Sequence, residues 1–96
     1  TPNNDGQIIR ITLPQLTQDR RKELVKVVHR RLEEGRVAIR NVRRDVLDHF
    51  KQLRKENLAT EDDVRGGEAR LQKLTDRYVS DADKVGQRKE AEILEV

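Results

Sequence analysis

The feature that most constrains this chain is a run of about 40 residues, from about 18 to 57, with no proline and a single glycine. Apolar or small residues recur through this run at a mean step of about 3.6 residues, the period of an α-helix. They are Leu24, Val28, Leu32, Gly35, Ile39, Val42, Val46, Phe50 and Leu53. A helix of this length would extend about 60 Å, so the pattern predicts an element of a bundle or coiled coil. Thr17 is its expected N-cap, with Asp19 in the first turn.

A second helix is predicted to begin at Thr60 and to run to about Leu94, after a short connection at residues 57–59. Thr60 followed three residues later by Asp63 approximates a capping box, and acidic residues favour a helix N-terminus. Because a short loop makes consecutive long helices antiparallel neighbours, the two helices should form a hairpin. A heptad pattern in the second helix predicts the seam positions, with Tyr78 in the core. The seam residues are Val64, Gly67, Leu71, Leu74, Tyr78 and Val85.

Residues 8–13, with the sequence IIRITL, are β-branched and partly alternate in polarity. This pattern predicts a short strand, which Pro14 ends because proline lacks the backbone donor. Nothing later in the chain resembles a second strand, and a lone strand leaves its backbone groups unpaired. The strand is therefore expected to belong to a sheet that lies mostly elsewhere.

The apolar stripes of the two helices are wider than a two-helix seam needs. The residues that broaden them are Val25, Val27, Val79 and Ala82. A third helix, from this protein or from a partner, would satisfy these positions. With the lone strand and the absence of methionine, they favour half of a larger protein. The expected fold class is mainly α: a long antiparallel helical hairpin from an incomplete three-helix bundle, with a short N-terminal β-strand remnant of a second domain.

Several function classes lack their sequence signatures. The chain has no cysteine, which excludes disulfides and cysteine-based zinc sites, and no apolar run approaches the roughly 20 residues of a membrane span. His29 and His49 lie twenty residues apart, which favours helix-surface positions over a metal pair. There is no His-Glu-x-x-His motif, no phosphate-cradling glycine loop and only one serine, Ser80. The chain is therefore not expected to be an enzyme or to hold a metal or cofactor.

Charge is distributed unevenly along the chain. Residues 20–55 carry thirteen Lys/Arg against five Asp/Glu, whereas residues 56–96 carry seven against eleven. At about 100° per residue, a set of basic side chains falls in one sector of the first helix, beside its apolar stripe. The set is Arg36, Arg40, Arg43, Arg44, Lys51 and Arg54. Like charges four residues apart destabilise an isolated helix, and the planar donor fork of arginine suits phosphate.

Two interpretations of this basic sector are open. It would dock along a phosphate backbone, and shape recognition of folded RNA then fits better than the reading of base edges. Alternatively, it is a solvated face whose arginine stems cover apolar edges. A rival function, from a different class, is a non-catalytic, coiled-coil-like helical module for protein–protein interaction, whose basic helix pairs with an acidic partner helix.

Three motifs resemble the bacterial ribosome recycling factor family, in the order and at the spacing of the family. They are LPQLTQDRRKEL at residues 13–24, GRVAIRNVRRD at 35–45 and LQKLTD at 71–76. The resemblance covers essentially the whole chain and implies an L-shaped, two-domain protein, of which this chain matches the carboxy-terminal half. Residues 1–13 would be the terminal part of the small β-rich domain, 14–17 the hinge, and 18–96 the second and third helices of the three-helix bundle domain.

The resemblance also implies an activity without catalysis. After translation termination such a factor binds the large ribosomal subunit and, with the GTPase elongation factor G, splits the ribosome. It would act in the cytoplasm, with ribosomal RNA and elongation factor G as partners and with no membrane, DNA or cofactor. The RNA-binding residues implied are Arg21, Arg40, Arg43 and Arg44, to which the helix geometry adds Arg36. The hinge residues implied are Pro14, Gln15, Leu16 and Thr17.

Overall fold

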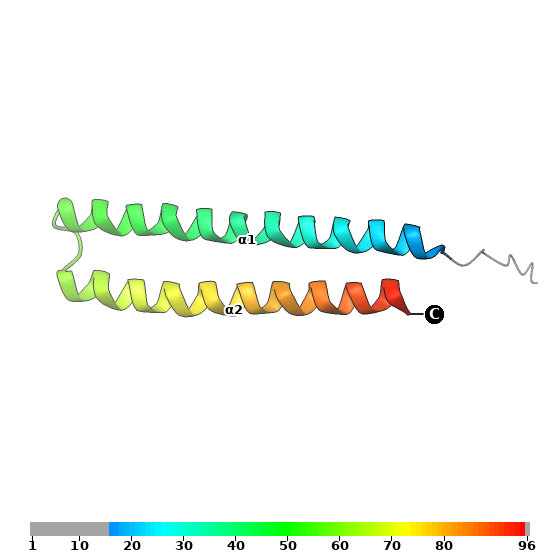
Figure 1. Ribbon diagram of the computed structural model, residues 1–96. Helices are drawn as coiled ribbons and strands as arrows, with labels where there is room; N and C mark the ends of the chain where they lie inside the picture. Colours follow the sequence, from blue (N-terminus) through cyan, green and yellow to red (C-terminus); the bar gives the residue numbers. More distant parts are fainter. Residues whose placement is uncertain (1–15, 96) are drawn as a thin grey trace, which may run out of the picture.

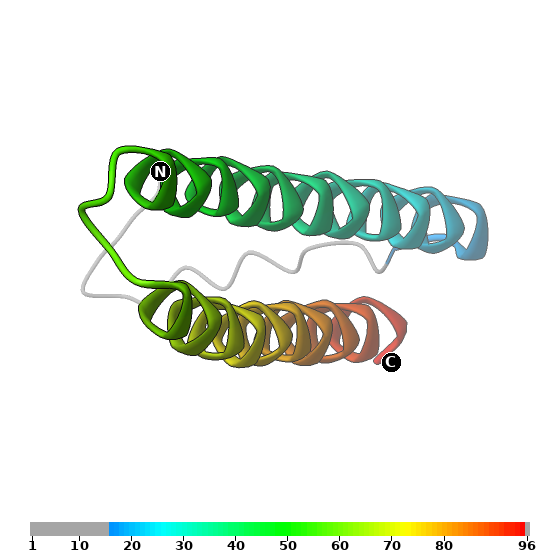
Figure 2. The same cartoon turned by 90° about the vertical axis from the view of Figure 1, so that its left-hand side faces the viewer.

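The computed structural model describes residues 16–95, which form two long helices, α1 (Gln18–Lys55) and α2 (Glu61–Leu94). The helices run antiparallel and lie side by side, joined by a short loop at one end (Figure 1, Figure 2). At about 1.5 Å per residue they are about 57 and 51 Å long. The predicted mainly-α class and the helical hairpin are confirmed. The predicted strand at residues 8–13 and the hinge residues Pro14 and Gln15 lie outside the described residues.

Both helices begin at the threonine caps that the sequence predicts. The hydroxyl of Thr17 accepts a hydrogen bond from the N–H of Arg20 at 3.0 Å. At the start of α2, the Thr60 hydroxyl accepts from the Asp63 N–H, and the Asp63 carboxylate accepts from the Thr60 N–H, both at 3.0 Å. This reciprocal pair is a complete capping box, which satisfies backbone donors that a helix start leaves free.

The capping box makes α2 sensitive to acid. Hydrogen bonds from Thr60, chiefly from its backbone N–H, hold the pKa of Asp63 below its ordinary value. A carboxylate whose pKa is lowered by folding stabilises the folded state above its unfolded pKa, and this contribution disappears as the pH falls through the folded value. We therefore expect Asp63→Asn to lower the helicity at neutral pH and to reduce the further helix loss below about pH 4, as measured by circular dichroism.

The matched control for this experiment is Asp62→Asn. Asp62 lies in the same turn, and within residues 16–95 it pairs with the exposed Arg65 alone, at 3.4 Å, so its removal should leave the acid sensitivity unchanged. The same pH profile in both variants would contradict the role given to the capping box.

The end of α1 is set by a residue with left-handed backbone. Asn57 has a φ of 58°, a conformation that asparagine tolerates better than most residues. The N–H groups of Asn57 and Leu58 then donate to the carbonyls of Arg54 and Leu53, at 3.1 and 2.9 Å. This pattern is a Schellman motif. It ends α1 at Lys55, two residues before the boundary that the periodicity predicts.

Small and polar residues of α2 lie where the two helices come closest. A Cβ atom added to Gly86 would lie 2.7 Å from Cδ2 of Leu32, and one added to Gly67 would lie 3.1 Å from the Phe50 ring. Thr75, between these glycines, is only 8% exposed. The line of closest contact on α2 therefore passes through Gly67, Thr75 and Gly86.

The prediction that Tyr78 is a core residue is wrong for the described hairpin, because its side chain is 56% exposed. Leu74 and Val85, which the heptad also places at the seam, are 48% and 56% exposed. The physical reason is the position of the contact line. Leu74 and Val85 directly precede Thr75 and Gly86 on this line, so they lie about 100° back around the helix. Tyr78, three residues after Thr75, lies about 60° back, so all three are rotated toward one side of the hairpin.

Exposed apolar side chains line an apolar groove between the helices. One part has a volume of about 350 Å³, and its apolar lining is Ala38, Ile39, Val42, Leu71, Leu74 and Tyr78. The other part, of about 450 Å³, lies toward the open end of the hairpin and includes Val27, Val28, Leu32, Gly35, Ala82 and Val85. Among residues 16–95 no hydrophobic side chain is fully buried. The apolar stripes are thus wider than two helices cover, as the sequence indicates. Of the residues predicted to broaden them, Val27 and Ala82 line this groove, whereas Val25 and Val79 do not.

Candidate nucleic-acid interface

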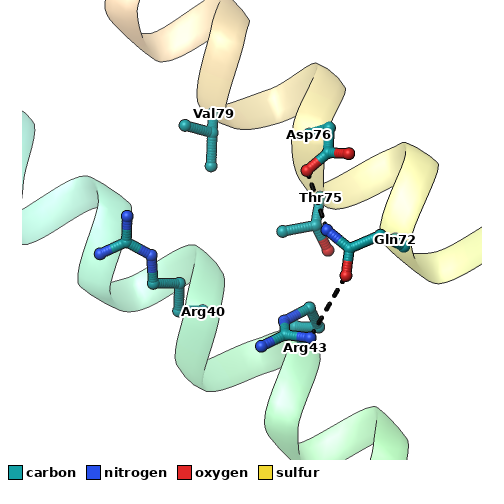
Figure 3. Close-up of a pocket in the computed structure, with 6 residues that line it drawn as sticks. All are labelled: Arg40, Arg43, Gln72, Thr75, Asp76 and Val79. Atoms are coloured by element: carbon teal, nitrogen blue, oxygen red, sulfur yellow. Dashed lines mark hydrogen bonds between the residues drawn. The ribbon is translucent and has the colours of Figure 1, made fainter.

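A polar groove lies on the other side of the helix contact. It has a volume of about 270 Å³ and is lined by Arg40, Arg43, Gln72, Thr75, Asp76 and Val79 (Figure 3). We call it the arginine groove. Arg43 and Thr75 also border the apolar groove, so the helix contact is the wall that the two grooves share. One side of the hairpin is therefore apolar, and the other presents charged side chains from both helices.

Three of the predicted RNA-binding arginines lie at or beside the arginine groove. The side chain of Arg40 is 57% exposed, and its Nη1 lies 3.8 Å from a glutamate oxygen two turns earlier in α1. Arg43 donates from Nη1 to the amide oxygen of Gln72 at 3.3 Å. Arg44, which is exposed, donates from Nη2 to the amide oxygen of Asn41 at 2.6 Å. Because amide oxygens carry no net charge, Arg43 and Arg44 are held without being neutralised by these contacts.

Arg36 lies in the same sector of α1 but already contacts two carboxylates. Its Nε and Nη2 donate to Oδ1 of Asp83 at 3.0 and 2.6 Å, and its Nη1 donates to Oε2 of Glu33 at 3.1 Å. The hydrogen bond with Asp83 is the main reason that the pKa of Arg36 is raised. Its side chain is 28% exposed. Arg36 therefore clamps α1 to α2, and a phosphate would have to displace these carboxylates.

Arg21 is turned inward in this structure and is only 9% exposed. Its Nη1 donates to the carbonyl oxygens of Ile93 and, at 2.9 Å, of Glu95. Carbonyls at a helix C-terminus lack partners within the helix and carry partial negative charge. Arg21 thus ties the start of α1 to the end of α2. Sequence reasoning missed this contact because its partners are backbone atoms more than 70 residues away, and RNA binding by Arg21 stays a prediction.

The other predicted basic and hinge residues lie apart from the arginine groove. Lys51 and Arg54 are exposed near the loop, where Arg54 borders a hollow of about 320 Å³. Of the described hinge residues, Leu16 is 44% exposed and Thr17 caps α1. Of the predicted set, the structure therefore places Arg40 and Arg43 in the arginine groove, with Arg44 one turn after Arg40 on α1. Arg36 lies one turn before Arg40, and the two share the carboxylate of Glu33.

Of the two histidines, His29 pairs with a carboxylate at the surface. Within residues 16–95, no group of three or more histidine and carboxylate side chains could hold a metal ion. His29 lies 3.2 Å from the Glu90 carboxylate across the two helices, at an exposed position, in agreement with the predicted helix-surface role. Neither α1 nor α2 is long and apolar enough to cross a membrane.

The described residues define the class of this protein: a long helical hairpin with an uncovered apolar groove and a polar groove lined by arginines. The family model described as "Ribosome recycling factor" matches residues 1–94. This chain belongs to the ribosome recycling factor family, and the resemblance carried by its three motifs is confirmed.

The sequences of individual relatives are about half identical to this chain. The ribosome-recycling factor of Heliobacterium modesticaldum is 52% identical over 96 residues, which are 100% of this chain and 52% of that protein. The one of Thermomicrobium roseum is 55% identical over 95 residues, 99% of this chain and 51% of that protein. The chloroplastic ribosome-recycling factor of Spinacia oleracea is 51% identical over 96 residues, 100% of this chain and 35% of that protein. The chain therefore spans about half the length of the bacterial relatives that it matches.

Proposed function

We propose that this chain is the bundle part of a cytoplasmic factor that recycles ribosomes after translation termination. Family membership supports the process, and the exposed arginines of α1 support the way in which the chain would act. Arg40, Arg43 and Arg44 would bind phosphates of large-subunit ribosomal RNA and so anchor the rigid hairpin. Elongation factor G, a translocation GTPase, would then push on the rest of the factor, which a hinge at residues 14–17 connects to the bundle. Splitting of the ribosome would be mechanical and would need no catalytic residue.

The observation that carries this proposal is the difference among the arginines of one helix sector. Arg36 is occupied by two carboxylates, whereas Arg43 and Arg44 contact amide oxygens. Guanidinium donors that the protein leaves unused remain available for bidentate contacts with phosphate. Phosphate contacts fix the position of a protein on RNA without reading sequence, which fits a factor that recognises a folded RNA by shape.

A second candidate function is a non-catalytic helical module for protein–protein interaction. The apolar groove favours it, because large exposed apolar patches commonly mark a partner site. RNA would contact the arginine groove alone, whereas a partner helix would cover the apolar groove even where its acidic side chains also pair with the basic helix α1. Substitutions in the apolar groove therefore separate the two functions.

Binding to isolated ribosomal subunits tests the proposed function. We expect the chain to bind large subunits in preference to small ones, with an affinity that falls as salt rises. Each phosphate contact contributes about 0.7 to 0.9 to the slope of log affinity against log salt, so three contacts predict a slope of about −2 to −3. Sedimentation with subunits over a salt series measures this slope. Equal binding to both subunits, or an affinity that ignores salt, would contradict the proposal and favour the interaction module.

A further inference from the structure

The motif LQKLTD at residues 71–76 supplies three polar residues of the arginine groove, Gln72, Thr75 and Asp76, of which the first and last are linked to Arg43. Gln72 accepts through Oε1 from Nη1 of Arg43 at 3.3 Å, and it donates through Nε2 to Oδ1 of Asp76 at 2.9 Å. Figure 3 shows this chain of hydrogen bonds between the two helices. Arg43, Gln72 and Asp76 therefore form one hydrogen-bond chain, which begins on α1 and ends on α2.

The chemistry of the two ends fixes the direction of the central amide. A carboxylate such as Asp76 only accepts hydrogen bonds, and a guanidinium such as Arg43 only donates them. The NH₂ group of Gln72 must therefore point to Asp76 and its oxygen to Arg43. The reversed amide would place two donors together at one end and two acceptors at the other. Because Gln72 and Asp76 lie four residues apart, they share one face of α2, and the arrangement needs no distortion of the helix.

The hydrogen-bond chain holds the Arg43 side chain in place without neutralising its charge. The contact with Gln72 uses one of the five N–H donors of the guanidinium. The carboxylate of Asp76 binds the amide and forms no ion pair with Arg43 in the described part of the chain. The contact between Arg36 and Asp83, about two turns away along the same helices, is the opposite arrangement, because a carboxylate binds that guanidinium directly at 2.6 Å.

We propose that Gln72, oriented by Asp76, is a positioning residue that presents the Arg43 guanidinium to an RNA phosphate. The inference rests on the proposed function, and it brings α2 into the docking site through a neutral side chain. An arginine that is already held loses less rotamer freedom when it binds. A neutral acceptor provides this order while the full positive charge stays available to the phosphate.

Gln72→Glu tests the inference, because it places a carboxylate of the same size beside Arg43. We expect the affinity for large ribosomal subunits to fall about tenfold and the salt slope to flatten by about 0.7 to 0.9, since the new ion pair competes with the phosphate. Helicity and thermal stability should change little, because the ion pair gained with Arg43 is offset by the loss of the hydrogen bond to Asp76 and by two carboxylates four residues apart on α2. Gln72→Met removes the acceptor without adding charge and should weaken binding only about threefold, with the slope unchanged.

The matched control is Gln87→Glu, the same substitution at an exposed position of α2. Gln87 lies fifteen residues from Gln72, about 22 Å along the helix, so its charge is screened from Arg43 and the affinity should stay near that of the unmodified chain. In an Arg43→Ala background, Gln72→Glu should have little further effect.

Three results would overturn the inference. They are an equal loss of affinity from Gln87→Glu, an undiminished effect of Gln72→Glu on top of Arg43→Ala, and no effect of Gln72→Glu where Arg43→Ala weakens binding. The last of these would leave the proposed function intact. If Arg43→Ala, Arg40→Ala and Arg44→Ala all leave binding unchanged, the proposed function and this inference fail together.

Discussion

Replacing Arg40, Arg43 and Arg44 together by alanine should weaken binding to large ribosomal subunits by about three orders of magnitude. A hydrogen bond to a charged group contributes about 1.5 to 3 kcal/mol, so each lost arginine–phosphate contact weakens binding about tenfold or more. The slope of log affinity against log salt should flatten by about 2 to 3, because three phosphates keep their counterions. Subunit sedimentation over a salt series measures both quantities on the same samples.

The control removes three exposed arginines from α2 instead, by substituting Arg65, Arg70 and Arg77. The net charge falls by the same amount, so a similar loss in both triple variants would mean that overall charge drives binding and that the docking face is wrong. A difference in folding between the two triple variants should not affect the comparison of their affinities. The contacts of Arg40, Arg43 and Arg44 within the chain are exposed ones, which stabilise a protein little, so circular dichroism should show equal helicity.

Features that depend on local sequence were predictable in this fold. A threonine cap is satisfied by atoms within three residues, so Thr17 and Thr60 could be assigned correctly from the sequence. The end of α1 was less predictable, because it depends on Asn57 taking a left-handed backbone, which many sequences avoid. Tyr78 was assigned wrongly for the contact between α1 and α2, since a heptad pattern gives the apolar stripe of a helix but not which part of that stripe meets the neighbouring helix.

Of the candidate RNA-binding site, the sequence could predict only which side chains share one sector of α1. The helical period places Arg36, Arg40, Arg43 and Arg44 in one sector, and it says nothing of what faces them from α2. Asp83 lies 47 residues from Arg36, and the carbonyl partners of Arg21 lie still further along the chain. Such partners follow from the register between the helices, which the sequence pattern does not specify. The division into structural and available arginines therefore required the three-dimensional structure.

A charge placed in the apolar groove should distinguish an open groove from a covered one. Val42 is 61% exposed in this chain, so Val42→Asp should change the free energy of unfolding by about 0.5 kcal/mol or less, as at other surface positions. The comparison is a chimera that joins this chain to the part of the Heliobacterium modesticaldum relative that it does not match. A third helix over the groove would bury the new carboxylate without a partner, at a cost of about 3 to 5 kcal/mol. Urea unfolding followed by circular dichroism measures both values.

The difference between the two proteins isolates the effect of covering the groove, because the helix propensities of valine and aspartate contribute equally to both. Val37→Asp is the matched control, since Val37 is 45% exposed and lines neither groove. It should cost little in the chain and in the chimera. A small cost of Val42→Asp in both proteins would mean that the groove stays open in the longer protein, and it would contradict the expected three-helix bundle. If Val42→Asp lowers the free energy of unfolding strongly in the chimera alone, the apolar groove is the binding surface of a third helix. The arginine groove is then the side that stays available to RNA.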